Sequence, residues 1–176
     1  MGDGCISISK GKSWDIGMSS KDIEFINEFA RCVKEVYGFD CSIRTTKQGE
    51  GAFGAGNSIY VADLYSKEVV DDILRYDEYK HFKHHTGRVP NAIKGADLKI
   101  KSAYLRAFFD SQGTLQFHKK RRHRCISAIK ADERSVDEIA HLLSTLGIRS
   151  KIYSRIDKKY GVKQWTLVIS RRKFIE

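Results

Sequence analysis

The second half of the chain repeats the order of elements that the first half predicts, and this repeat is the strongest constraint on the fold. In the first half, two alternating segments that begin at Cys5 and Ser13 precede a helical apolar stripe that runs to Tyr37. A second alternating pair and a helical pattern at about 66–76 follow. Alternation with period two predicts strands, whereas apolar residues spaced by three and four predict helices.

After Gly113 the same order returns, which makes the chain a tandem repeat of one unit. Ser19 or Ser20 is expected to cap the first long helix, and Asp132 is expected to cap its counterpart. A glycine is expected to end each of these helices, and in the first half this glycine is Gly38. We therefore predict an α+β fold of two pseudo-symmetric αββαββα halves, each with an antiparallel sheet that has its helices on one face.

The two halves are joined by a basic stretch that contains the only proline of the chain. The predicted division is an N-terminal half at residues 1–80, a linker at 81–97 and a C-terminal half at 98–176. His81, His84 and His85 lie in this stretch with a spacing that zinc sites use, but no cysteine or acidic partners accompany them. A linker that crosses the molecule is the better interpretation.

The charge of the chain indicates an anionic partner. Its 176 residues include 32 Lys+Arg against 22 Asp+Glu, a formal net charge of +10. Such a field favours nucleic acid, and the alternative is a basic protein whose charge only keeps it in solution. The cysteines lack metal-site or disulfide spacing, and no membrane span or signal peptide is present, so we expect a cytoplasmic protein, nucleoid-associated in a prokaryote, with no membrane partner.

The segment "AYLRAFFDSQG" before the second strand pair combines a small-residue helix face with a polar residue and a glycine. Ala103, Ala107 and Ser111 are spaced by four, so they line one side of a helix and let a second helix approach closely. Taken alone, this stripe also fits an ordinary core helix. The order of polar residue, glycine and strand recurs at the start of the chain in "MGDG", so two such helices side by side would bring Asp3 next to Gln112.

"YLRAFFDSQG" resembles the signature of the LAGLIDADG homing endonucleases, and "MGDG" resembles the end of a first copy. The order of strands and helices after each motif also fits that family. The resemblance implies a single-chain enzyme, a functional monomer encoded in an intron or intein, that cuts both strands of a long, partly asymmetric double-stranded DNA site. It also implies that the two sheets form a saddle over the major groove, with the motif helices at the interface. The matching or similar positions are Leu105, Ala107, Phe109, Asp110, Ser111 and Gly113.

The resemblance further implies a divalent metal at the ends of the motif helices, Mg²⁺ in catalysis, with Mn²⁺ or Ca²⁺ as substitutes in binding. Mapped onto this chain, the ligands are Asp3 and Gln112, with the carbonyls of Gly2 and Ser111 as helpers. Metal ions would activate a water and neutralise charge on the departing oxygen.

Lys130 matches the basic residue that the family places near the metals, and Ser19 is the expected equivalent in the first half. A solvated lysine at the end of a strand is the alternative interpretation of Lys130. Its position relative to the motif favours a catalytic role.

Gln112 departs from the family pattern because it stands where the family usually has an acid. Its neutral side-chain oxygen supplies no charge, so the metal is expected to bind more weakly on that side. Three explanations stay open: an asymmetric site that still cuts, an enzyme that nicks or no longer cleaves, and an engineered variant that traps a DNA complex. The first is favoured because Asp3 and phosphate oxygens could still hold a shared metal.

Both ends of the sequence depart from the family pattern as well. Met1 falls at the sixth place of the first motif, and "RRKFIE" at the end reads as the start of a helix. We expect that flanking residues supply the rest of both helices; the alternatives are an internal start of the chain and a second chain that supplies the helix.

Strand alternation assigns one face of each sheet to the DNA, opposite the apolar faces of Trp14 and Trp165. Arginine and glutamine read guanine and adenine edges, whereas lysines mostly hold phosphates. The basic run at 118–124 is expected to contact phosphates from a hairpin turn. The predicted DNA-binding residues are Ser7, Ser9, Arg44, Thr46 and Tyr60 in the first half, and Gln116, His118, Lys119, Lys120, Arg121, Arg122, Arg124, Lys151, Tyr153, Arg155, Gln164 and Thr166 in the second.

Two further hypotheses belong to other functional classes. The first is an RNA-binding maturase that helps a host intron splice, for which Gln112 is an argument because cleavage would be dispensable. The second is a DNA-binding or nicking relative without full catalysis. Cleavage of an intron-free target with Mg²⁺ would separate these hypotheses.

Overall fold

The structure, a computed structural model, describes residues 4–9, 13–47, 58–78, 87–118, 123–157 and 161–170. Several predicted sites lie outside the described residues: the ligands Gly2 and Asp3, the basic residues Lys119, Lys120, Arg121 and Arg122, the histidines His81, His84 and His85, and the final segment 171–176. No described helix has the length and apolar character needed to cross a membrane.

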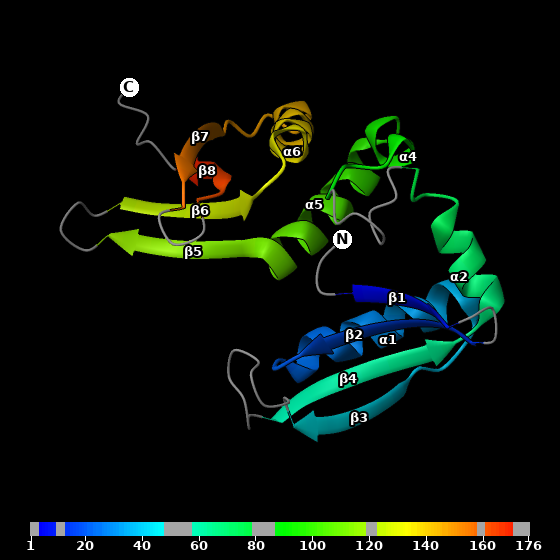
Figure 1. Cartoon of the computed structure of the whole chain (residues 1–176). Coiled ribbons are helices and arrows are strands. Elements are labelled where there is room, and N and C mark those ends of the chain that lie inside the picture. Colours follow the sequence, from blue (N-terminus) through cyan, green and yellow to red (C-terminus); the bar gives the residue numbers. More distant parts are fainter. Residues whose placement is uncertain are drawn as a thin grey trace. The chain divides into compact units, whose positions relative to one another are not determined.

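The chain divides into two compact units, one at Asp3–Arg75 and the other mainly at Tyr76–Glu176. The first unit has an antiparallel four-stranded sheet in the order β1-β2-β4-β3 (Figure 1). Its core contains Ile16 and Leu64 of the sheet and residues of both helices, so α1 and α2 pack on one face. Its elements are β1 (Gly4–Ser9), β2 (Ser13–Ser20), α1 (Ile23–Tyr37), β3 (Ser42–Lys47), β4 (Ser58–Tyr65) and α2 (Lys67–Leu74).

The second unit repeats this topology, with the strand order β5-β6-β8-β7 (Figure 1). Its core joins Ala128 and Leu167 of the sheet to Leu105 and Phe108 of α5 and to the apolar side of α6. The predicted α+β fold with a repeated antiparallel sheet is therefore confirmed. The elements are α4 (Asn91–Lys94), α5 (Leu98–Gln112), β5 (Gly113–His118), β6 (His123–Lys130), α6 (Glu133–Thr145), β7 (Lys151–Ile156) and β8 (Lys163–Ser170).

The long helix that follows each hairpin is capped by an aspartate. Asp22 accepts a hydrogen bond from the Glu24 N–H at 2.9 Å, so the predicted cap at Ser19 or Ser20 is wrong. The reason is that β2 continues through Ser20, which leaves the serines inside the strand. Asp132 caps α6 as predicted. Gly38 ends α1 in the left-handed region with φ of 78°, a conformation that glycine adopts without strain.

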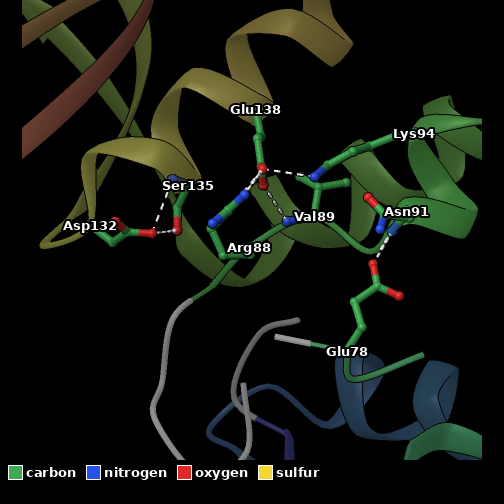
Figure 2. A network of polar contacts seen from close by, with 8 residues as sticks. All are labelled: Glu78, Arg88, Val89, Asn91, Lys94, Asp132, Ser135 and Glu138. Carbon is green, nitrogen blue, oxygen red and sulfur yellow. Dashed lines mark hydrogen bonds and ion pairs between the residues drawn. The ribbon is translucent and has the colours of Figure 1, made fainter. Parts of the chain in front are cut away.

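The described part of the predicted linker packs against the second unit and is anchored by Glu138 of α6 (Figure 2). One carboxylate oxygen accepts from Arg88 Nε at 2.8 Å and from Lys94 Nζ at 2.7 Å. The other accepts from the Val89 N–H at 2.8 Å. The Val89 side chain is fully buried in the core of the unit. This stretch is therefore part of the folded unit, including the short helix α4, which the sequence pattern did not predict.

Candidate functional site

The "FFDSQG" motif spans the point where helix α5 ends and strand β5 begins. Asp97 caps the helix by accepting from the Ile100 N–H at 2.8 Å, and Leu105 and Phe108 anchor one side of it in the core. Gln112 is the last helical residue, and Gly113 begins β5 without an intervening loop. The Gly113 N–H still donates to the Phe109 carbonyl. The direction of the last helical turn is thus tied to the start of the sheet.

Gly113 permits this abrupt transition because a side chain would collide with the helix. A Cβ at this position would lie 2.4 Å from the Phe109 carbonyl oxygen, and that backbone atom cannot move without disturbing the turn. We expect Gly113→Ala to lower the free energy of unfolding by about 1–3 kcal/mol, the usual cost of overpacking. Chemical denaturation measures this loss. Gly95→Ala is the matched control, because its Cβ would meet its nearest atom at an ordinary 3.7 Å; equal stability of the two variants would contradict the steric explanation.

Lys130 and Gln112 meet at the end of α5. The Lys130 ammonium donates to Gln112 Oε1 at 2.9 Å, and it lies 5.4 Å from the centre of the Phe108 ring. Both side chains are half-buried. A Cβ on Gly87 would lie 3.9 Å from Lys130 Nζ, so the linker backbone passes close to the ammonium. The structure therefore brings together two of the three predicted catalytic residues.

The equivalent of Lys130 in the first half is Ser20, not Ser19 as predicted. Lys130 stands two residues before the cap of α6, and Ser20 stands two residues before the cap of α1. Their strand partners also correspond, because Ser20 pairs with Tyr60 and Lys130 pairs with Trp165. Where the second half has the Lys130 ammonium at the end of β6, the first half thus has the Ser20 hydroxyl at the end of β2.

The two described residues that were predicted as ligands, Ser111 and Gln112, offer oxygen atoms to a metal but no negative charge. Gln112 Oε1 already accepts from Lys130. The Ser111 hydroxyl donates back to the Ala107 and Phe108 carbonyls at 3.0 and 3.1 Å. In the part of the chain that the structure describes, no three His, Cys, Asp or Glu side chains are grouped as a metal site would need. The predicted ligand set therefore depends on Asp3, and the described residues fit a divalent cation only in part.

The register of the strands sorts side chains onto the two faces of each sheet. Residues directly opposite one another in an antiparallel pair share a face. We call the face opposite the helices the outer face. Most of the predicted DNA-binding residues in the described strands lie there, and His118 ends β5 with a side chain that is not described. Those on the outer face are Ser7, Ser9, Arg44, Thr46, Gln116, Lys151, Tyr153, Arg155, Gln164 and Thr166.

The predicted face is wrong for Tyr60 and Arg124. Tyr60 pairs with Ser20, which shares the helix-facing side with Met18 and Ile16. Arg124 pairs with Phe117 on the helix-facing side, and its guanidinium lies 5.2 Å from the centre of the Phe117 ring. Both residues lie near strand ends, where the helix-facing side is no longer fully covered. With their side chains on the helix-facing side, neither residue contacts a ligand that lies on the outer face.

The two outer faces differ in charge. On the first sheet, Arg44 is paired with Asp63 at 2.6 Å, and Asp15 is on the same face. Burial and the negative charges of Asp15 and Asp63 raise the pKa of the Cys5 thiol, which shares this face. The described strand residues of the second outer face include Lys151 and Arg155 and no carboxylate. The second face therefore suits an anionic backbone better than the first.

Sequence reasoning missed the polar groups that support the predicted contacts. Gln116 donates from Nε2 to the Ser127 hydroxyl at 3.1 Å, and its Oε1 lies 3.7 Å from Cys125 Sγ. Arg155 donates to Gln164 Oε1 at 3.4 Å, and Gln164 donates to Asp157 at 3.2 Å. These partners come from neighbouring strands or from the hairpin turn, so only the register reveals them.

Comparison with known proteins identifies the second half and the fold. Residues 99–176 match a LAGLIDADG-like domain. No curated protein matches the chain. Among solved structures, mesophilic variants of the homing endonuclease I-DmoI align with a TM-score of 0.61 and 16% identity, over 96% of this chain and 77% of theirs. The homing endonuclease I-WcaI, solved bound to its DNA recognition sequence, aligns with a TM-score of 0.61 and 15% identity, over 96% of this chain and 70% of its own. Full-length DUF199/WhiA from Thermatoga maritima aligns with a TM-score of 0.55 and 13% identity, over 96% of this chain and 47% of its own.

Proposed function

We propose that this chain, which carries a LAGLIDADG-like domain at residues 99–176 and has the fold of single-chain homing endonucleases, is a site-specific double-strand DNA endonuclease. The observation that carries the proposal is the contact between Lys130 and Gln112 at the end of α5, where the motif helix enters the sheet. I-DmoI has been solved with its target DNA in the presence of Mg, and with DNA and Mn or Ca. We propose that this chain acts as a monomer, uses Mg²⁺ and is encoded in an intron.

Each group of residues in this chain would have a separate role in DNA binding or cleavage. The outer faces of the sheets bind the DNA, with Lys151 and Arg155 among the cations that hold it. Asp3, Gln112 and the carbonyls of Gly2 and Ser111 would hold the metal, which supplies charge neutralisation and an activated water. The Lys130 ammonium, held by Gln112, offers a positive charge and a proton donor to the phosphate oxygens.

A cleavage assay tests this function. The purified protein is incubated with Mg²⁺ and a long intron-free DNA library that includes its host locus, and the products are sequenced. Cuts in both strands at one site support the proposal, and a cut in one strand supports a nicking enzyme. Specific binding without any product would contradict the endonuclease and favour a non-cleaving DNA-binding protein.

The intron maturase is a second candidate, and Gln112 is the observation that favours it. In this structure the position that usually carries an acid holds a neutral amide already bonded to Lys130. A protein that only folds RNA would tolerate that loss of charge. Splicing of the host intron, in the absence of DNA cleavage, would distinguish this candidate.

A substitution at Gln112 is expected to strengthen metal binding at the proposed site. Gln112→Glu keeps the side-chain length and adds the missing negative charge, so the Mg²⁺ concentration for half-maximal cleavage is expected to fall about tenfold, equivalent to roughly 1.4 kcal/mol. Cleavage rates over a Mg²⁺ titration measure this shift. Asp110→Glu is the control, because Asp110 is exposed and its carboxylate lies 3.6 Å from Arg106 Nε. An unchanged Mg²⁺ requirement in the Gln112 variant would show that residue 112 does not contribute to the metal site.

A further inference from the structure

Asp63 fixes Arg44 on the outer face of the first sheet. Asp63 Oδ2 accepts from Arg44 Nη2 at 2.6 Å. The Asp63 side chain is only 13% exposed, whereas the Arg44 side chain is 55% exposed. The carboxylate is therefore held within the sheet surface, while much of the guanidinium stays accessible to a ligand.

Gly17 makes room for this carboxylate. A Cβ on Gly17 would lie 2.7 Å from Asp63 Oδ1 and 3.7 Å from Cys5 Sγ, so any larger residue would displace the carboxylate or strain it. Gly17 pairs directly with Asp63 across β2 and β4. Strands β2, β3 and β4 together thus build one support for Arg44.

The second sheet has no such support. Val168 pairs with Lys151 and Ser127, as Asp63 pairs with Ser42 and Gly17. Two residues after Lys151 comes Tyr153, as Arg44 comes two residues after Ser42. The carboxylate and the guanidinium are therefore replaced by an aliphatic and an aromatic side chain, and the arrangement belongs to the first half only.

We propose that Arg44, positioned by Asp63, reads a guanine in the part of the target that the first sheet binds; this inference rests on the proposed DNA-binding function. The guanidinium fork matches the guanine O6 and N7 acceptors in the major groove. An arginine already held at one nitrogen loses less conformational freedom when it binds the base. Asp63 is the positioning residue, and Arg44 determines the specificity. A surface ion pair without a role in recognition is the alternative.

The test is a selection from a randomised double-stranded DNA library without Mg²⁺, followed by sequencing of the enriched sites. The wild-type protein is expected to enrich a site with one strongly preferred guanine that Arg44 controls. Arg44→Lys keeps the charge but lacks the fork, so the preference at that one position is expected to fall about tenfold or more, with the other positions unchanged. Asp63→Asn is expected to weaken the same position by a smaller factor, because the arginine loses its anchor.

Arg31→Lys is the matched control. Arg31 is also an exposed arginine paired with carboxylates, Glu28 and Glu35, but it lies on α1 and not on a sheet face. Its selected site is expected to equal that of the wild type. Thermal melting of each variant excludes loss of fold. An enriched site whose preferences are all unchanged by Arg44→Lys would overturn the inference alone, whereas a wild-type protein that enriches no sequence would overturn the proposed function and the inference with it.

Discussion

Lys130→Met is expected to lower the rate of DNA cleavage by about a hundredfold while specific DNA binding persists. Methionine keeps most of the length of the side chain, but it removes the ammonium that donates to Gln112 Oε1 at 2.9 Å and lies 5.4 Å from the centre of the Phe108 ring. If that ammonium stabilises charge that develops on the phosphate, its loss affects the transition state more than the ground state. Single-turnover cleavage at saturating protein measures the rate, and a gel-shift titration without Mg²⁺ measures binding.

Lys163→Met is the matched control for this prediction. Lys163 also lies at the end of a strand of the second sheet, and its ammonium lies 4.2 Å from the centre of the Trp165 ring. Lys130, and not Lys163, donates to Gln112, so the removal of the Lys163 ammonium is expected to change the rate less than about twofold. Equal rates for wild type and Lys130→Met would show that Lys130 is a structural partner of Gln112 and nothing more. A parallel loss of binding and rate would place its role in DNA binding.

The repeat of the fold could be predicted because its signals are local. Alternation and helical spacing are visible within six to fifteen residues, and the two halves confirm one another. Asp132 was predictable as a cap for the same reason, since the residue and the helix it caps are adjacent. The cap of α1 was not, because Ser20 and Asp22 are both good caps and only the true length of β2 decides between them.

The faces of β4 and β6 could be predicted less well because their sequences do not alternate cleanly. Both faces of β4 carry apolar residues, with Ile59 and Val61 on one face and Ala62 and Leu64 on the other. The pairing with β2 decides the matter and turns Tyr60 toward the helices. Arg124 lies on the helix-facing side near the end of β6, where its side chain is exposed.

The support of the candidate contacts could not be predicted because it depends on distant residues. Asp63, Gly17 and Arg44 come from three strands, and nothing in the sequence near Arg44 indicates that a carboxylate holds it. The contact of Lys130 with Gln112 was indicated only through the resemblance to a family, since the residues are 18 positions apart. The register of the sheets therefore shows which distant residues are neighbours, and the local sequence pattern does not.

Glu138→Gln is expected to lower the free energy of unfolding by about 2–3 kcal/mol at pH 7, because the amide cannot balance the charges of Arg88 and Lys94. The Glu138 side chain is 16% exposed, so solvent screens this network little. Urea denaturation followed by circular dichroism measures the loss. Asp137→Asn is the control, since Asp137 is the exposed neighbour on the same helix, and its expected change is within about 0.5 kcal/mol.

The pH dependence of this difference identifies its electrostatic origin. Burial alone would raise the pKa of Glu138, but hydrogen bonds from Arg88, Lys94 and the Val89 N–H outweigh it and lower the pKa from 4.5 to about 2. Because the folded pKa lies below the unfolded one, the carboxylate contributes stability that is fully present above about pH 4.5 and is lost as the pH falls toward about 2. The gap between wild type and Glu138→Gln should therefore narrow steadily over that range. A gap that stays constant down to pH 3 would show that the carboxylate acts through its shape and not through its charge, because a charge effect must diminish as Glu138 takes up its proton.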